Sequence, residues 1–317
     1  MVRWNRLLAG VAVALVACAA GFAAPPGGPQ LAGCPVFPAN NVWNARVDGL
    51  PAASISARVV ASIGTAKPLH PDFGSGLWDG GPIGIPVTAV PAGQPALRVA
   101  FDYAGESDPG PYPIPAGVKI EGGANSTGDR HAILVQQGSC RLFELYDLHP
   151  APGGWTAGSG ATWDLKGNAL RQAGWTSADA AGLPILPGLA RFEELAGGIH
   201  HALRFTAPLT RRAFVWPARH HAGATADPAF PAMGARFRLK AGFDTAGFGP
   251  QARAVLRALK DYGMILADNG SSWFVSGVPD ERWDNDDLRG LGRVKGSDFE
   301  LVDAGRLQAG PDSAAVR

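Results

Sequence analysis

The sequence predicts a mainly β fold, specifically a two-sheet antiparallel sandwich of jelly-roll type with long loops and two or three short helices. Short segments in which apolar and polar residues alternate recur along the chain, as expected of half-buried strands. The chain of 317 residues contains 43 Gly and 27 Pro, which disfavour long helices. Its 46% apolar and 17% charged residues indicate a folded core and argue against intrinsic disorder.

The predicted strands are short and are separated by loops rich in Gly and Pro. Residues 202–205 and 236–239 place apolar side chains on one face and polar side chains on the other, which is typical of antiparallel strands with one face buried. The predicted strands span residues 83–90, 96–103, 131–137, 141–147, 161–165, 201–207, 212–217, 235–240, 264–267 and 272–276.

Helical periodicity is restricted to a few segments. Residues 54–63 begin with serines suited to capping a helix. Residues 250–262 place Val255, Leu256 and Leu259 on one face, and Gly263 follows as a C-terminal cap. A third, short helix is predicted at residues 189–195.

The first 24 residues have the pattern of a cleaved signal peptide. Arg3 and Arg6 precede an uncharged apolar run over residues 7–20, which is shorter than the roughly 20 residues needed to span a bilayer. Cleavage would change the formal net charge from +1 to −1. An uncleaved anchor is one alternative, and another is lipidation of Cys18, because residues 15–18 match a bacterial lipobox.

The remaining chain is interpreted as one domain with an extension at each end. Residues 25–33 are predicted to be a Pro/Gly tether, residues 34–302 a single β-rich domain, and residues 303–317 a frayed tail. The processed chain is expected to be an exported monomer, extracellular or periplasmic, with no integral membrane span. Its near-neutral charge argues against binding to nucleic acid.

Two cysteines remain after processing, Cys34 and Cys140. In an exported protein this number suggests one disulfide, because the environment is oxidising. The alternative is two separate buried thiols. A zinc site is disfavoured, since neither cysteine has a close Cys or His neighbour in the sequence.

Acid–base chemistry on sugars is the first catalytic hypothesis. Glu121 and Asp129 flank a polar loop that leads to a strand at His131, and Asp179 lies in another polar loop. Glycoside hydrolysis needs two carboxyl groups, and any pair of these residues is a candidate for that role. The alternative interpretation of Glu121 and Asp129 is that they only stabilise turns.

A lyase reaction is an equally open hypothesis for the same loops. Elimination from a uronic acid needs a base near the sugar and a positive group near its carboxylate. His201 is the candidate base, with His131 as the alternative base or transition-state donor, and Arg130 or Arg204 would neutralise the substrate.

Metal-dependent hydrolysis is the alternative in which a cofactor takes part; the main hypothesis needs none. His70, Asp72 and His220 are candidate ligands of zinc, together with His201 or the Asp129–His131 pair. Calcium is considered for a cluster of aspartates, which is better interpreted as a solvated loop because it lacks EF-hand spacing. This cluster consists of Asp280, Asp284, Asp286 and Asp287.

Tryptophans in polar loops are candidate platforms for sugar rings. Trp78 precedes Asp79 and two glycines, and Trp175 lies in the same loop as Asp179. The competing interpretation is that tryptophans fill the core of a β fold.

The chain resembles a group of secreted microbial proteins of unassigned activity. The similarity covers most of the processed chain and implies secretion and a single domain, but it implies no catalytic residue. The shared phrases are NVWN at 41–44, HPDFG at 70–74, IEGG at 120–123, GDRH at 128–131, GWTSADAAGLP at 174–184 and HALRF at 201–205.

The combined hypothesis is a secreted carbohydrate-active enzyme, either a glycoside hydrolase or a polysaccharide lyase, acting on a cell-wall or environmental polysaccharide. A non-catalytic glycan-binding or envelope protein is the first alternative, and a metal-dependent hydrolase is the second.

Overall fold

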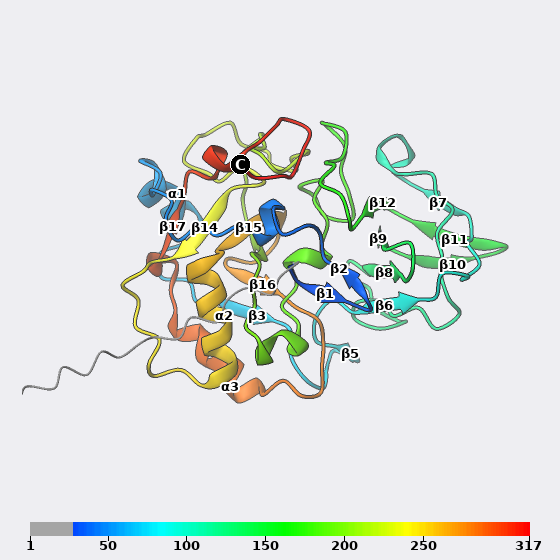
Figure 1. Ribbon diagram of the computed structural model, residues 1–317, viewed down its shortest axis with the longest axis horizontal. Helices are drawn as coiled ribbons and strands as arrows, with labels where there is room; N and C mark the ends of the chain where they lie inside the picture. Colours follow the sequence, from blue (N-terminus) through cyan, green and yellow to red (C-terminus); the bar gives the residue numbers. More distant parts are fainter. Residues whose placement is uncertain (1–27) are drawn as a thin grey trace, which may run out of the picture.

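The computed structural model describes residues 28–317. The expected signal peptide and Cys18 lie outside these residues. The described chain is mainly β, with 28% strand and 17% helix, and it contains several sheets and a few short helices (Figure 1). The predicted class is therefore confirmed. Among residues 28–317, none of the helices has the length and apolar character needed to cross a membrane.

The larger of the two main sheets has six strands in the order β17-β14-β15-β13-β16-β3. Strands β13 and β15 are parallel, as are β16 and β3, whereas the other neighbours are antiparallel. Helix α1 contacts β17, and helix α2 contacts β14. The bounds are β3 His70–Asp72, β13 Leu203–Ala207, β14 Arg236–Leu239, β15 Met264–Asn269, β16 Phe274–Ser276, β17 Phe299–Leu301, α1 Ser56–Ile63 and α2 Pro250–Asp261.

The second main sheet has four strands in the order β12-β9-β8-β6, of which β6 and β8 are parallel. A three-stranded sheet, β10-β11-β7, and two small hairpins, β1–β2 and β4–β5, complete the strands of the described region. The bounds are β1 Gln30–Leu31, β2 Cys34–Pro35, β4 Leu77–Trp78, β5 Gly81–Pro82, β6 Val87–Val90, β7 Val99–Phe101, β8 Ala132–Gln136, β9 Arg141–Tyr146, β10 His149–Ala151, β11 Gly154–Ala157 and β12 Ser159–Asp164.

The prediction of purely antiparallel sheets is wrong, and a two-sheet jelly roll is not confirmed. Parallel neighbours require a crossover between them. The crossover from β13 to β15 includes β14 and α2, so helices and strands are interleaved along this half of the chain. The sheets of the described chain do not close into a barrel.

Most predicted elements form, with trimmed ends. Helix α2 ends as predicted, and Gly263 follows it with φ +68°, where a Cβ would lie 2.1 Å from the Phe237 carbonyl oxygen. The predicted strand 212–217 is wrong, because only isolated bridges form there, including one between Phe214 and Met233. The predicted helix 189–195 is replaced by two 3-10 turns, at Leu186–Gly188 and Phe192–Ala196.

The remaining short helical elements lie in connecting loops. They are η1 Val42–Asn44, η2 Ala104–Glu106, α3 Asn285–Arg289, η5 Gly290–Arg293, η6 Gly296–Asp298 and η7 Ala304–Leu307.

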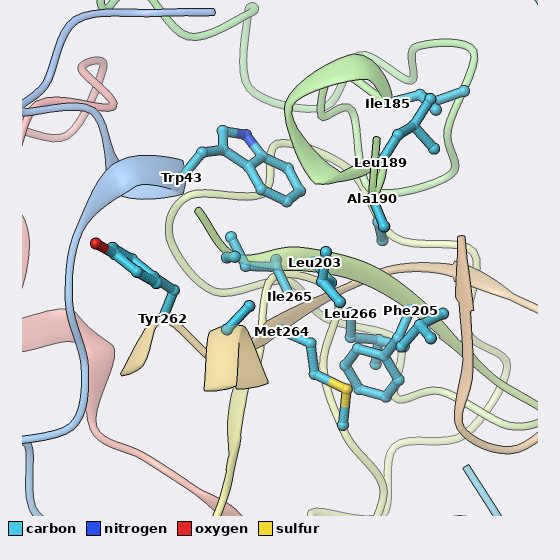
Figure 2. Packing of buried hydrophobic residues seen from close by; sticks show 14 of the residues in the cluster. Trp43, Ile185, Leu189, Ala190, Leu203, Phe205, Tyr262, Met264, Ile265 and Leu266 are labelled. Atoms are coloured by element: carbon cyan, nitrogen blue, oxygen red, sulfur yellow. The ribbon is translucent and has the colours of Figure 1, made fainter. Parts of the chain in front are cut away.

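The main hydrophobic core lies around β13 and β15. Side chains of these strands, including Leu203, Phe205 and Leu266, pack with Ile185 and Leu189 from a loop that runs beside them (Figure 2). Burial of each such side chain contributes roughly 1.5–3 kcal/mol. This core places an irregular stretch of chain against the six-stranded sheet.

That stretch, residues 177–190, is here called the buried segment. All of its residues are buried except Ala180, which is half-buried. Its main chain bonds to the six-stranded sheet, since the Ala181 N–H donates to the Ala267 carbonyl and the Ala190 N–H donates to the Ser276 carbonyl. Toward the four-stranded sheet, Glu144 on β9 accepts hydrogen bonds from the N–H groups of Ile185 and Leu186. The buried segment therefore connects the two main sheets.

The ends of the described chain are attached to the domain, which corrects two predictions. Within the predicted tether, β1 pairs with β2. Within the predicted frayed tail, Ser313 and Ala315 form bridges to Ala169 and Asn41, and Ala314 is buried. The tail is held because its small residues fit against the main core while its backbone groups find partners.

The predicted disulfide is confirmed: Cys34 on β2 is bonded to Cys140 in the turn before β9. The two residues are 106 positions apart. Closing so long a loop restricts the unfolded chain and stabilises the fold. A disulfide is compatible with an exported protein.

We predict that removing the Glu144 carboxylate destabilises the domain. Glu144→Ala would leave the N–H groups of Ile185 and Leu186 buried without an acceptor, at a cost of about 1–3 kcal/mol for each. Glu144→Gln retains one acceptor oxygen and should cost less. Urea unfolding monitored by circular dichroism measures the difference, with the exposed Glu281→Ala as control. Equal stability of the Ala and Gln variants would contradict this role.

Candidate functional site

His131 and Glu121 form a buried pair at the start of β8. The His131 Nδ1 lies 2.6 Å from Glu121 Oε2, and its Nε2 lies 2.9 Å from the Ala178 carbonyl oxygen. Burial alone would lower the pKa of His131, but the Glu121 carboxylate outweighs it and raises the pKa to about 9. The ring is therefore charged near neutral pH and donates from both nitrogens. It positions Glu121 and the buried segment, and it is not free to accept a proton.

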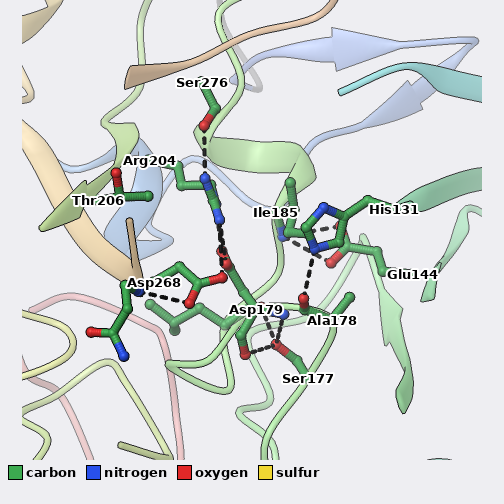
Figure 3. A network of polar contacts seen from close by, with 12 residues as sticks. His131, Glu144, Ser177, Ala178, Asp179, Ile185, Arg204, Thr206, Asp268 and Ser276 are labelled. Atoms are coloured by element: carbon green, nitrogen blue, oxygen red, sulfur yellow. Dashed lines mark hydrogen bonds and ion pairs between the residues drawn. The ribbon is translucent and has the colours of Figure 1, made fainter. Parts of the chain in front are cut away.

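Arg204 and Asp179 form a second buried pair, between β13 and the buried segment (Figure 3). Arg204 Nε lies 2.7 Å from Asp179 Oδ2, and Nη2 lies 2.6 Å from Oδ1, so the pairing is bidentate. Arg204 Nη1 donates to Ser276 Oγ at 2.7 Å. Burial opposes the charge of Arg204, but Asp179 compensates for it and the pKa of Arg204 is raised. Asp179 is thereby paired with a cation at a position that excludes water.

Asp268, at the end of β15, lies beside this pair, but its carboxyl group is farther from the Arg204 guanidinium than that of Asp179 is. Its Oδ2 is 3.4 Å from Arg204 Nη2, and 21% of its side chain is exposed. Burial and then the nearby Asp179 carboxylate raise the pKa of Asp268 to about 8. The site thus contains a neutral carboxylic acid next to the ion pair of Asp179 and Arg204.

Asp268 faces a cleft of about 420 Å³, here called the acidic cleft. Carboxyl groups from several loops line it, and His220 is the one basic side chain in its lining. His220 is held at the cleft by a 2.8 Å contact between Nδ1 and the Ala180 carbonyl oxygen. The residues that give the cleft its character are Tyr103, Glu106, Asp129, Tyr146, Asp179, His220 and Asp268.

A second cavity, of about 580 Å³, is lined in part by β3 and is here called the aromatic cavity. Its lining includes Trp78, which is 79% exposed, and the stacked rings of His70 and Phe274, whose centroids are 4.1 Å apart. Asp72 lines it too. Burial and then the carboxylates of Glu121 and Asp129 raise the pKa of Asp72. Asp72 therefore lies near enough to the Glu121 loop to sense its charge.

Several predicted site residues are brought together although they are far apart in the sequence. Glu121, Asp129, His131, Asp179 and Arg204 all belong to the paired charges or to the acidic cleft. Arg204 is buried and bonded to Asp179, so its predicted contact with substrate is replaced by a positioning role.

Other predicted residues lie elsewhere, for identifiable reasons. His201 is fully buried, with Nε2 3.1 Å from Glu194 and Nδ1 2.8 Å from the Ala202 carbonyl oxygen, so it is not available as a base. Arg130 is also buried and donates to the carbonyls of Leu148, Ala124 and Ser126, which leaves it unable to bind a substrate carboxylate.

Trp175 does not line the acidic cleft. It lies in a neighbouring cavity, where the Arg171 guanidinium is 5.6 Å from its ring centroid. Its ring therefore packs against a cation and does not form the predicted platform for a sugar in the acidic cleft.

The candidate metal ligands do not assemble. Among residues 28–317, no group of three or more His, Cys, Asp or Glu side chains could hold a metal ion. His70 and Asp72 face the aromatic cavity, whereas His220 faces the acidic cleft. In the cluster of aspartates at residues 280–287, the Asp284 carboxylate caps α3 by accepting hydrogen bonds from the N–H groups of Asp286 and Asp287.

Sequence reasoning missed Asp268 and the two cleft tyrosines, Tyr103 and Tyr146. A signal for Asp268 was available, because it directly follows the predicted strand 264–267 and precedes Asn269 and Gly270. Polar residues at the end of a buried strand are well placed to reach a site. No comparable pattern distinguishes Tyr103 or Tyr146.

Comparisons of the chain with protein-family models, with curated proteins and with solved structures find no match. Function is therefore inferred from the contacts and charges of the site itself.

We predict that Asp268→Asn makes stability less sensitive to alkaline pH. The folded pKa of Asp268, about 8, exceeds the unfolded value of about 3.9, so the folded state holds the proton more tightly. Stability is accordingly lost as the pH rises from about 4 through about 8. Asn is neutral throughout, and the variant should gain roughly 4 kcal/mol over the wild type between pH 5 and pH 9, at about 1.4 kcal/mol for each pH unit up to the pKa of about 8. Urea unfolding at both pH values measures this, and parallel pH profiles would contradict it.

Proposed function

We propose that this protein is an exported, monomeric glycoside hydrolase that acts on a polysaccharide at the acidic cleft, with Asp268 as the general acid. The observation that carries the proposal is the neutral carboxylic acid of Asp268, which faces the cleft beside the ion pair of Asp179 and Arg204. Glycoside hydrolysis requires such a division of roles, because one carboxyl group must donate a proton while another is ionised.

Each step of the reaction has a candidate group. Asp268 would protonate the glycosidic oxygen, which leaves with that proton as the bond to the anomeric carbon breaks. Asp129, exposed in the same cleft, is the candidate carboxylate for activating water or for attacking the anomeric carbon. The added water supplies the hydroxyl of one product. Glu121 is held by His131 and, with Arg204, positions the charges around the cleft.

The charge of the cleft favours hydrolysis over uronate elimination. A lyase needs a positive group to neutralise the carboxylate of its substrate. Here the lining carboxyl groups outnumber the one histidine, and the nearby guanidinium of Arg204 is already paired with Asp179. A polyuronate would be repelled from this cleft, whereas a neutral glycan would not. Tyr103, which is 58% exposed at the cleft, offers an aromatic face for a sugar ring.

The route of export belongs to the same proposal. The confirmed disulfide is compatible with either a freely secreted chain or one anchored through a lipid on Cys18. Intact-mass measurement of the exported protein distinguishes the two, because a lipidated chain begins at Cys18 and carries the added acyl mass.

We predict that Asp268→Asn and Asp129→Asn each reduce the release of reducing sugar by about 10²- to 10⁴-fold, the range expected for a lost acid or base. The activity of the wild type should fall as the pH rises through about 8, because Asp268 then loses its proton. The assay uses a panel of neutral polysaccharides, and the exposed Asp244→Asn is the matched control.

Two results would reject the hydrolase proposal. If the wild type releases no product from any glycan of the panel but binds one of them, the protein is a glycan-binding protein instead. If product forms and both variants retain full activity, the reaction does not use this pair of carboxyl groups.

We predict that Trp78→Ala weakens the use of long substrates. An exposed ring in the aromatic cavity, beside Asp72, is suited to stack on a sugar some distance from the cleft. The variant should raise KM for a polysaccharide roughly three- to tenfold and leave a short aryl glycoside unaffected. Leu209→Ala, which also truncates an exposed apolar side chain, is the control. Equal effects on both substrates would place Trp78 outside the binding path.

A further inference from the structure

A third cavity, of about 630 Å³, shares no lining residue with the acidic cleft. Its walls come from the loop before α1, from residues 211–216 and 228–236, and from residues 301–308 of the attached C-terminal tail. We call it the arginine cavity. Its volume is in the range of small-molecule sites, which is roughly 300–1,000 Å³.

Arg211 lines this cavity without a counter-ion. Its Nε is buried and has no hydrogen-bond partner, and within residues 28–317 its guanidinium forms no ion pair. Leaving a buried donor unsatisfied costs about 1–3 kcal/mol, so native proteins seldom do so without a reason. The Nη groups also have no hydrogen-bond partner within residues 28–317, and unlike Nε they are not buried, so a ligand in the cavity can reach them.

The charge around Arg211 is positive. Arg236 also lines the cavity, and its guanidinium donates to the carbonyls of Val42, Ala45 and Tyr262 rather than to a carboxylate. Burial lowers the pKa of Arg236 to about 9, which leaves it charged at neutral pH. Asp303 is the acidic residue of the lining, and it pairs with Arg306 at 2.9 Å. The cavity therefore has a net positive charge and attracts an anion.

Much of the rest of the lining is apolar. Val215 is 41% exposed and Ile55 is similarly accessible, while Trp216, Phe230 and neighbouring prolines form further wall area. The indole nitrogen of Trp216 donates to the Ser313 carbonyl, which fixes the orientation of the ring. A ligand that fits such walls has an apolar body as well as a negative group.

We propose that the arginine cavity binds a small monocarboxylate with an apolar body, whose carboxylate accepts a hydrogen bond from Arg211. The carboxylate pairs with the accessible Nη end of the guanidinium, which has no other counter-ion, and the apolar part covers Val215, Ile55 and Phe230. This site is separate from glycan hydrolysis and does not depend on that proposal.

The test is isothermal titration calorimetry of the protein with octanoate and with its neutral counterpart, octanol. Saturable binding of octanoate is expected, with octanol weaker on the order of tenfold or more, because a charge-assisted hydrogen bond is absent. Arg211→Gln should weaken octanoate binding by a similar factor and leave octanol binding unchanged. Arg212→Gln, the exposed neighbouring arginine, is the matched control and should bind both probes as the wild type does.

A second variant tests the proposal in case the Arg211→Gln protein does not fold. Val215→Glu places a carboxylate on the accessible rim of the cavity, where it competes with octanoate for the positive charge. It should reduce octanoate binding while the thermal melt stays close to that of the wild type. The proposal is wrong if octanoate does not bind saturably, if octanol binds equally well, or if a folded Arg211→Gln protein retains the wild-type affinity.

Discussion

The buried segment, residues 177–190, lies between the two main sheets, and its backbone groups must be hydrogen-bonded for the sheets to be held together. An irregular backbone away from water must find a partner for each N–H and carbonyl group. The sheets supply those partners: His131 donates to Ala178, Glu144 accepts from Ile185 and Leu186, and Ala267 and Ser276 pair with the main chain. The two sheets are joined through these bonds rather than by face-to-face packing alone.

The same partners assemble the charges of the site. Bringing Asp179 into the interior requires a cation, which Arg204 provides from β13. Once that pair is satisfied, the guanidinium compensates for Asp268 only partly, and this second carboxyl group keeps its proton near neutral pH. The neutral acid facing the cleft is thus a consequence of how the buried segment is stabilised. Structural support and chemistry share one network of side chains (Figure 3).

The acidic cleft and the arginine cavity have opposite charge and are built differently. In the cleft, carboxyl groups at strand ends and in loops face one another, and the positive groups that balance them are buried behind the surface. In the arginine cavity, guanidinium groups lie against apolar walls and the single carboxylate is already paired. A neutral glycan in one and a small anion in the other would not compete for the same surface.

The local features of this protein could be predicted from the amino-acid sequence alone. Residues 250–263 specify their helix and its glycine cap, the alternation of 202–205 and 236–239 specifies strands, and two cysteines in the processed chain specify the disulfide. These features follow from periodicity and composition within a short window. The candidate residues Glu121, Asp129, His131 and Asp179 were identified because they lie in or beside polar loops, but the sequence did not show that these loops converge.

The pairing of the strands, and the accessibility of each polar side chain to a substrate, became known only from the three-dimensional structure. Alternation reports that a strand has a buried face, but it does not identify the partner, so the parallel pairs β13–β15 and β6–β8 were not predicted. The same limit applies to charges. His201 and Arg130 have the residue types expected of a site, yet each is fully engaged by backbone or carboxylate groups that the folded loops bring to it, whereas Asp268 remains accessible. Availability for chemistry depends on three-dimensional neighbours, which a linear pattern does not contain.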